Sequence, residues 1–319
     1  MRLLLRLNLL HGIALMAVLF CLLLVAQFAN AAIPRFPQAF AGKIVFSANE
    51  KLWVVQRKGG VAIRLTNGIG QDIYPRASPD GRWIAYTEIS RAGTDVWVLP
   101  SAGGTPRRLT YHTGSGLDNI VVTWTPDSKN VVYMSAHAQW NRSVNGLYQV
   151  PVTGGLPQAL PIDDAVGMAT YAPDGHTIAY NRIFTQYGNW KRYDGGMARE
   201  VFTYDFHTRS LHQITNWHGM NAAPMWYGRK IYYLSDQDSR RRANLWVHDV
   251  ETGQARQITH FTDYDIDTPA LGDHAITFQQ GSMLYRLDLP DESLHAVGLS
   301  IADDQRYTMQ RSVPIRDAV

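Results

Sequence analysis

Short apolar segments separated by turn residues run along most of the chain, and within them apolar positions recur at every second residue. Ile84-Ala85-Tyr86 and Val96-Trp97-Val98 are examples. Alternation with a period of two predicts β-strands. The Pro-Asp-Gly sequences at 79–81 and 173–175 predict tight turns, because Asp bonds its own backbone and Gly accepts a positive φ. No apolar stripe of helical period and length follows residue 31. The pattern therefore predicts an all-β protein.

Four such segments recur as a unit, and the unit occurs six times. The third segment of each unit carries an aromatic residue, at Trp53, Trp97, Tyr148, Phe202, Trp246 and Tyr285. A four-stranded repeat of about 40–45 residues is typical of the blade of a β-propeller. We expect the blades at about residues 36–66, 72–110, 118–161, 166–215, 221–259 and 267–298.

One blade cannot bury both of its faces, whereas blades stacked around an axis bury them against each other. We therefore expect one domain at residues 32–304, a six-bladed β-propeller of four-stranded blades. Residues 305–319 are expected to form a C-terminal tail, with a truncated linker as the alternative.

The first residues have a different character. Arg2 and Arg6 precede an apolar run at 12–26, which is followed by Ala29-Asn30-Ala31. This order is typical of a secretory signal peptide. We expect residues 1–31 to be removed on export to the periplasm or the medium, which would leave no membrane span. An uncleaved anchor is the alternative, although the run is short for a span of about 20 residues.

Charge and cysteine content exclude several classes of function. The chain has 30 Lys+Arg and 27 Asp+Glu, a formal net charge of +3. Loss of Arg2 and Arg6 brings this to 28 against 27, or +1, which predicts no nucleic-acid partner. The one cysteine, Cys21, lies in the apolar run, so the mature chain has neither a disulfide nor a catalytic thiol.

No catalytic motif is recognisable. The sequence lacks a Gly-x-Ser-x-Gly elbow, a phosphate-binding glycine loop and a His pair with metal-ligand spacing. We therefore predict no catalytic, cofactor or metal residues. The acidic residues Asp263, Asp265 and Asp267 are interpreted as a turn. The run 240–242 of three arginines is interpreted as a solvated turn, with an anion site as the alternative.

One segment departs from the repeat. Residues 183–200 form an insertion between the second and third segments of unit four. Within it, Trp190, Lys191, Arg192 and Tyr193 combine aromatic area with positive charge, a combination common at binding surfaces. They are our candidates for contact with a peptide or with another envelope protein. Packing of the insertion against the propeller is the competing interpretation.

The sequence resembles the N-terminal six-bladed propeller of tricorn-type serine peptidases, within the TolB-like group of propellers. The resemblance is carried by the segments at 95–98, 103–112, 146–161, 190–196, 224–236 and 261–272. It implies a non-catalytic, exported module that binds or gates peptides. In this family the catalytic Ser and His belong to later domains, so we expect none in this chain. A TolB-like interaction scaffold of the cell envelope and a fragment of a full-length serine peptidase are the alternatives.

Overall fold

A computed structural model describes residues 32–111, 118–137, 139, 144–183 and 191–302 of the chain. The chain divides into two units, Met1–Ile33 and Pro34–Val319, and the fold below belongs to the second. The predicted signal peptide and the predicted tail at 305–319 lie outside the described residues. Regular structure in the described part is entirely β, so no helix there is long and apolar enough to cross a membrane.

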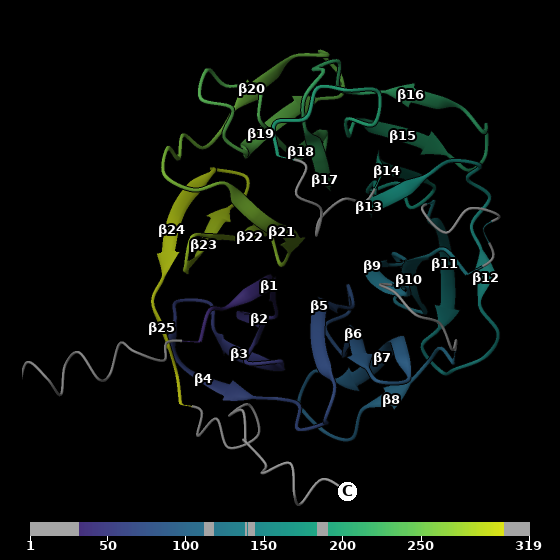
Figure 1. Cartoon of the computed structure of the whole chain (residues 1–319), viewed down its shortest axis with the longest axis vertical. Coiled ribbons are helices and arrows are strands. Elements are labelled where there is room, and N and C mark those ends of the chain that lie inside the picture. The colour runs from purple at the N-terminus through teal and green to yellow at the C-terminus, as the bar shows by residue number, and fades with distance from the viewer. Residues whose placement is uncertain (1–31, 112–117, 138, 140–143, 184–190, 303–319) are drawn as a thin grey trace, which may run out of the picture. The chain divides into compact units, whose positions relative to one another are not determined.

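The described strands form six sheets, each built from four antiparallel strands that are consecutive in sequence, and the first sheet also includes β25 (Leu299–Ile301) as a fifth strand (Figure 1). Blades one to three are β1 (Arg35–Phe40), β2 (Lys43–Ala48), β3 (Lys51–Gln56) and β4 (Gly60–Arg64); β5 (Gln71–Ala77), β6 (Trp83–Ser90), β7 (Gly93–Pro100) and β8 (Arg107–Arg108); and β9 (Ile120–Trp124), β10 (Asn130–Ser135), β11 (Gly146–Pro151) and β12 (Gln158–Ala159). Blades four to six are β13 (Val166–Tyr171), β14 (Thr177–Arg182), β15 (Val201–Asp205) and β16 (Leu211–Gln213); β17 (Asn221–Tyr227), β18 (Lys230–Ser235), β19 (Asn244–Asp249) and β20 (Ala255–Gln257); and β21 (Ile266–Gly272), β22 (Ala275–Gln280), β23 (Met283–Asp288) and β24 (Ser293–Val297).

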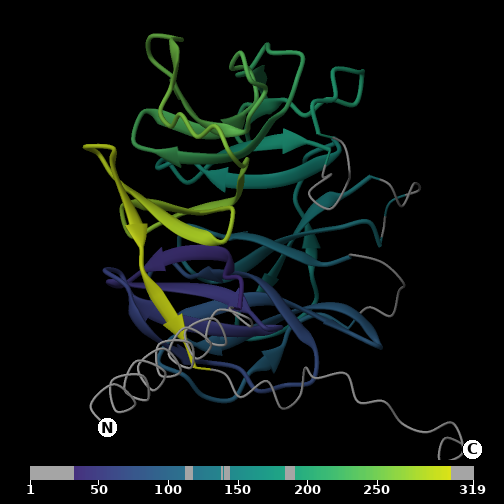
Figure 2. The same ribbon diagram turned by 60° about the vertical axis from the view of Figure 1, so that its left-hand side comes forward.

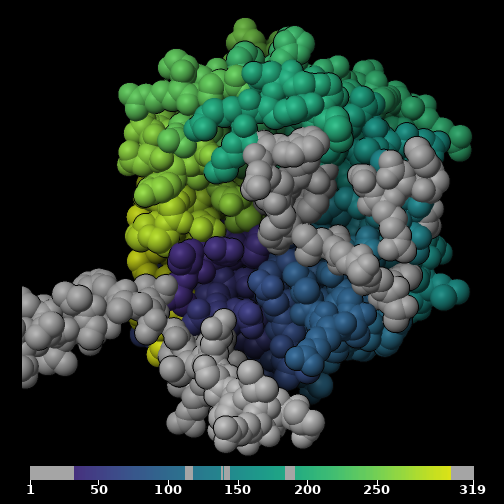
Figure 3. All heavy atoms as spheres, viewed as in Figure 1, coloured from purple at the N-terminus to yellow at the C-terminus, as the bar shows by residue number. Residues whose placement is uncertain are grey.

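The first strand of each blade lies nearest the centre of the ring and the fourth strand lies at its rim (Figure 1). The space-filling view shows the first blade, in purple, directly against the second and the last (Figure 3). The prediction of an all-β, six-bladed propeller is confirmed. The middle strands are almost completely buried, as at Tyr86, Tyr133 and Tyr232, because each blade is covered on both faces by its neighbours.

A bulge distorts the inner strand of most blades. In four of them, a residue with a positive φ directly precedes a proline, at Phe36, Tyr74, Ala223 and Thr268, and the pairing register shifts there. A bulge bends a strand and redirects a side chain. Phe36 and Tyr74 join Met168 and Ala223 in one buried apolar cluster, with the rings of Phe36 and Tyr74 4.3 Å apart.

Side chains of the described residues fill the axis of the ring. The cavity lined by all six inner strands has a volume of only about 40 Å³. Arg76 lies there, 5.8 Å from the ring centre of Tyr74, and its Nε donates to the Val122 carbonyl at 3.2 Å. Burial lowers the pKa of Arg76 to about 10, so the guanidinium is still charged at neutral pH. The centre of the ring is thus a packed core with one buried cation.

A threonine after the outer strand links it to the third strand in four blades. Each hydroxyl accepts a hydrogen bond of 2.9 Å from the backbone N–H fourteen residues earlier. The pairs are Thr66 with Leu52, Thr110 with Val96, Thr215 with Val201 and Thr259 with Leu245. This contact explains the recurring Leu-Thr and Ile-Thr endings of the repeat, because an unpaired buried N–H is costly.

The ring closes where the segment after blade six joins the sheet of blade one. After blade six, β25 (Leu299–Ile301) pairs in parallel with β4, and Figure 2 shows this yellow segment beside the purple strands of the first blade. Gly60 N–H donates to the Gly298 carbonyl at 2.9 Å. Arg57 reaches Asp273 at 3.2 Å and Asp288 at 2.6 Å. The added parallel strand and Arg57 join the two ends of the ring, together with hydrogen bonds from the Phe36 N–H to Thr268 Oγ1 and from Gln38 Nε2 to the Leu271 carbonyl.

Candidate functional site

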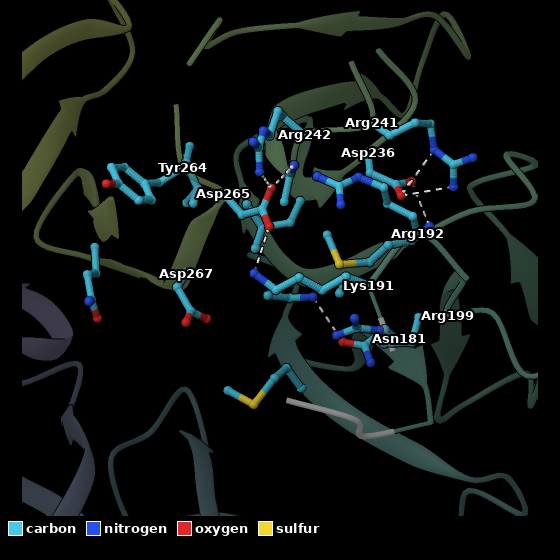
Figure 4. A pocket seen from close by; sticks show the side chains of 18 of the residues that line it. Asn181, Lys191, Arg192, Arg199, Asp236, Arg241, Arg242, Tyr264, Asp265 and Asp267 are labelled. Carbon is cyan, nitrogen blue, oxygen red and sulfur yellow. Dashed lines mark hydrogen bonds and ion pairs between the residues drawn. The ribbon is translucent and has the colours of Figure 1, made fainter. Parts of the chain in front are cut away.

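A cavity of about 290 Å³ opens where blades four, five and six meet, and we refer to it as the cup (Figure 4). It lies at the end of the ring where β17 and β21 begin and β14, β18 and β22 end. The connections β14–β15, β18–β19 and β20–β21 surround it. The insertion in blade four, predicted from the broken repeat, is the first of these connections.

The walls of the cup are both apolar and charged. Its apolar lining includes Met168, Met220, Ala222, Leu234 and Ile266. Five cationic side chains also line it, namely Lys191, Arg192, Arg199, Arg241 and Arg242. Three carboxylates accompany them, namely Asp236, Asp265 and Asp267. The cup therefore has an excess of positive charge beside apolar surface.

Asp265 binds two of the five cations. Lys191 Nζ lies 2.9 Å from Asp265 Oδ2, and an Arg242 Nη lies 3.6 Å from Asp265 Oδ1. Burial alone would raise the pKa of Asp265, but the hydrogen bonds from Lys191 and the Ala243 backbone, together with the two positive charges, hold this pKa below its ordinary value. Asp265 thereby attaches the insertion to the connection before blade six.

Arg241 is held by two other carboxylates. It bridges Asp194 of the insertion at 2.6 Å and Asp236 at 3.0 Å, and its guanidinium lies 5.2 Å from the ring centre of Trp217. Asp236 also accepts hydrogen bonds of 2.8 Å from Trp217 Nε1 and from the Met220 backbone. These contacts raise the pKa of Arg241. Arg241 and Asp236 are thus fully occupied as parts of the wall.

Arg199 differs from these three cations. Its carbonyl accepts the Asn221 N–H at 2.9 Å, which places it at the start of β17. Among the described residues, no hydrogen bond or ion pair involves its guanidinium. Burial lowers the pKa of Arg199, and the charges of Asp236 and Asp267 act in the opposite direction from beyond contact distance. Arg199 is partly exposed and is therefore a cation without a contacting anion in the described structure.

The structure places the four predicted contact residues differently. Lys191 and Arg192 line the cup, and Arg192 is exposed with a φ of 56°. Tyr193 is 38% exposed and is not part of the lining. Trp190 lies outside the described residues. Two of the four candidates therefore share one cavity.

Sequence reasoning missed most of the cup. Asp265 was interpreted as part of a turn and Arg241 and Arg242 as solvated residues, while Arg199 and Asp267 were given no binding role. The usable signal was positional. All of these residues fall where an inner strand begins or just before a third strand begins, and such points meet on one face of a propeller.

The lining of the cup presents charged and apolar groups. In the described part of the chain, no group of three or more His, Asp or Glu side chains is arranged to hold a metal ion. A Ser–His contact occurs at Ser135 and His137, whose Oγ and Nδ1 are 3.0 Å apart. Ser135 is completely buried and does not line the cup.

The fold is a six-bladed propeller with a cavity, the cup, on one face. A family model described as the tricorn protease N-terminal beta propeller domain matches residues 31–293. The chain belongs to this family. This confirms the resemblance on which the sequence interpretation relied.

Relatives and solved structures agree with this assignment. The chain is 25% identical over 290 residues to a tricorn protease homolog of Saccharolobus solfataricus, covering 88% of this chain and 26% of the relative. It is 26% identical over 177 residues to a putative tricorn-like protease N-terminal subunit of Sulfurisphaera tokodaii, covering 53% of this chain and 85% of that protein.

The crystal structure of the tricorn protease superposes with a TM-score of 0.74 at 22% identity, over 84% of this chain and 26% of that one. TolB from Acinetobacter baumannii superposes with a TM-score of 0.59 at 19% identity, over 81% and 60%. Both likenesses concern the fold. The chain spans about a quarter of the tricorn protease structure and of the Saccharolobus relative.

Proposed function

We propose that this chain is a non-catalytic propeller module of a tricorn-type peptidase system and that it binds short peptide segments in the cup. The observation that carries the proposal is the cup itself. It offers apolar side chains such as Leu234 and Ile266 beside an excess of cations. Cavities of this mixed character suit ligands with an apolar body and a polar or charged end.

The relatives support the assignment to a peptidase system. The Saccharolobus relative is named a tricorn protease homolog, and the Sulfurisphaera relative is named a putative tricorn-like protease N-terminal subunit. In the second case the name describes a subunit, and the match covers 85% of it. Our proposal is that this propeller likewise contributes binding, while the hydrolytic groups belong to other parts of the system.

The proposed site of action is outside the cytoplasm. The support is the arrangement of a basic start, an apolar run and Ala29-Asn30-Ala31 at the N-terminus. N-terminal sequencing of the exported protein should find Ala32 as the first residue. Recovery of intact Met1 from a membrane fraction would instead favour the anchor.

Calorimetric titration with N-acetylated tetrapeptides that vary in their apolar residues tests the binding role. We expect saturable binding with a stoichiometry of one. Arg192→Ala should weaken it without lowering the melting temperature, because Arg192 is exposed and makes no hydrogen bond or ion pair within the described part of the chain. The matched control is Arg240→Ala, an exposed arginine outside the cup. Absence of saturable binding, or equal binding by Arg192→Ala and the wild type, would contradict the proposal.

A further inference from the structure

We propose that the guanidinium of Arg199 is a carboxylate-binding site, so that the cup receives its ligand by a carboxylate group. The inference deepens the proposed function and rests on it, since it names the chemical group by which a peptide ligand is recognised. The carboxylate can come from a free peptide C-terminus or from an Asp or Glu side chain. The chemistry is the same in both cases, and the experiment below separates the two.

The first argument comes from the charges of the cup. Asp265 is bound by Lys191 and Arg242, and Asp236 is bound by Arg241. Asp267 lies more than 4.0 Å from any cationic atom of the described residues, and its Oδ1 accepts the Thr268 N–H at 3.0 Å. The carboxylates in the wall are thus either paired or out of contact.

Arg199 is accordingly left with unused donors. A guanidinium has five N–H groups in a planar fork and no acceptor, and the described residues take none of them at Arg199. Arg199 is partly exposed, so only water can occupy these donors until a ligand displaces it. A carboxylate with two oxygens fits this fork bidentately. Binding such a group would therefore satisfy a cation that the fold leaves unsatisfied.

The second argument comes from the closed axis. Met168 and Ala223 line both the cup and the axial cavity, so the cup that contains Arg199 lies next to the axis of the ring. Beyond it, Phe36, Tyr74, Met168 and Ala223 form a buried layer, and the axial cavity is only about 40 Å³. The packed axis therefore stops a ligand at the floor of the cup, and the ligand does not continue through the ring. A terminal or side-chain carboxylate is a suitable end group.

The other walls of the cup suit the part of the peptide that bears the carboxylate. Met168, Met220, Leu234 and Ile266 line the same cavity and can contact an apolar side chain. Arg192, exposed at the opening, adds a second cation without an ion pair among the described residues. Figure 4 shows Arg192 and Arg199 on the side of the cup formed by the insertion and Asp267 on the other side.

Three peptide series test the proposal in calorimetric titrations with the full chain. The first is N-acetylated and ends in Leu with a free carboxylate. The second has the same sequence with a C-terminal amide. The third is blocked at both ends and carries one internal Glu. We expect the amide to bind about 10- to 100-fold more weakly than the free acid if the C-terminus is the source, which is the range for a charged hydrogen bond. If the side chain is the source, the Glu peptide binds best.

Arg199→Gln should abolish the preference for the carboxylate-bearing peptide, with a loss of about 10- to 100-fold. Arg199→Lys, which keeps the charge but loses the fork, should retain part of the affinity. Arg240→Gln is the matched control and should bind as the wild type does. The melting temperature of Arg199→Gln should be unchanged, because the partly exposed guanidinium makes no hydrogen bond or ion pair with the described residues. A lower melting temperature with unchanged peptide preference would assign Arg199 to architecture and overturn the proposal.

A separate measurement distinguishes failure of this inference from failure of the proposed function. Sodium acetate, titrated against sodium chloride at constant ionic strength, should shift the side-chain Nε–H resonance of Arg199, which is identified by its absence in Arg199→Gln. An acetate-dependent shift without peptide binding would keep the carboxylate site and refute the peptide-binding function. Peptide binding that is equal for acid, amide and Glu peptides, with no acetate shift, would keep that function and refute the carboxylate site.

Discussion

Gly59 offers a direct test of how the ring is closed. It occupies a tight turn after β3, with a φ of 96°, and its N–H donates to the Gln56 carbonyl at 2.8 Å. The same turn recurs at Gly103 with a φ of 93° and at Gly154 with a φ of 91°. A Cβ at Gly103 or Gly154 would meet nothing within 4 Å, whereas a Cβ at Gly59 would lie well under 3.0 Å from the backbone oxygen of Gly298.

Gly59→Ala and Gly103→Ala should therefore share one destabilising effect, and Gly59→Ala should have a second. Both place a Cβ at a left-handed φ, which costs about 1–2 kcal/mol. Only Gly59→Ala also pushes against the segment that leads into β25, and crowding of a packed site costs about 1–3 kcal/mol. We expect Gly59→Ala to be less stable than Gly103→Ala by that second amount. For a domain of this size, each 1 kcal/mol corresponds to about 2–4 °C in melting temperature.

Urea denaturation of the two variants, with Gly154→Ala as a second control, measures the difference. Hydrogen exchange supplies the location, because amides in 293–301 should exchange faster in Gly59→Ala and not in the controls. Equal destabilisation of all three variants, or unchanged exchange in 293–301, would show that the parallel pairing of β25 with β4 contributes nothing to closure.

Three further predictions follow from the described contacts. Burial raises the pKa of Asp72 to about 7 from 3.8, so the folded state favours the protonated carboxyl. The free energy of unfolding should therefore fall by at most about 4 kcal/mol as the pH rises from 3.8 to 7. Asp72→Asn should remove this fall, and parallel pH curves for the variant and the wild type would refute it. Thr259→Val should cost about 1–3 kcal/mol in chemical denaturation because it leaves the Leu245 N–H buried without an acceptor, while the exposed Thr252→Val should cost far less. The purified chain should not hydrolyse peptides, and hydrolysis that a single Ser→Ala change abolishes would overturn that expectation.

The fold was predictable from sequence because the four strands of each blade are consecutive along the chain. Alternating segments such as Val96-Trp97-Val98 identify strands locally, and their sixfold recurrence identifies the propeller. The bulges were also visible in principle. Phe36-Pro37, Tyr74-Pro75, Ala223-Pro224 and Thr268-Pro269 occupy equivalent positions, but the sequence does not show that the first residue of each pair has a positive φ.

The cup was only partly predictable. The insertion was recognisable because it interrupts the repeat, and this identified Lys191 and Arg192. Arg199 belongs to the same insertion but follows a plain Met-Ala sequence, and nothing in its local context indicates a guanidinium without a counter-ion. Asp265 and Arg242 lie in two other connections, and their convergence depends on the angular placement of three blades around the axis. That placement depends on the tertiary structure, so no local sequence pattern predicts it.

The way the ring closes has a consequence for the order of folding. Contacts within a blade join neighbours in sequence, as in the threonine link of fourteen residues, whereas Arg57 and Asp288 are 231 residues apart. The entropy of loop closure rises by about 0.6 kcal/mol for each doubling of length, so the second contact costs about 2–3 kcal/mol more to form in an open chain. Each blade should therefore form early from its own strands. Blades that have already packed against each other shorten the length of open chain that must be closed before the first and last blades meet. The contacts of Arg57 and β25 are then the last to form, and the ring folds as a linear array until its final step.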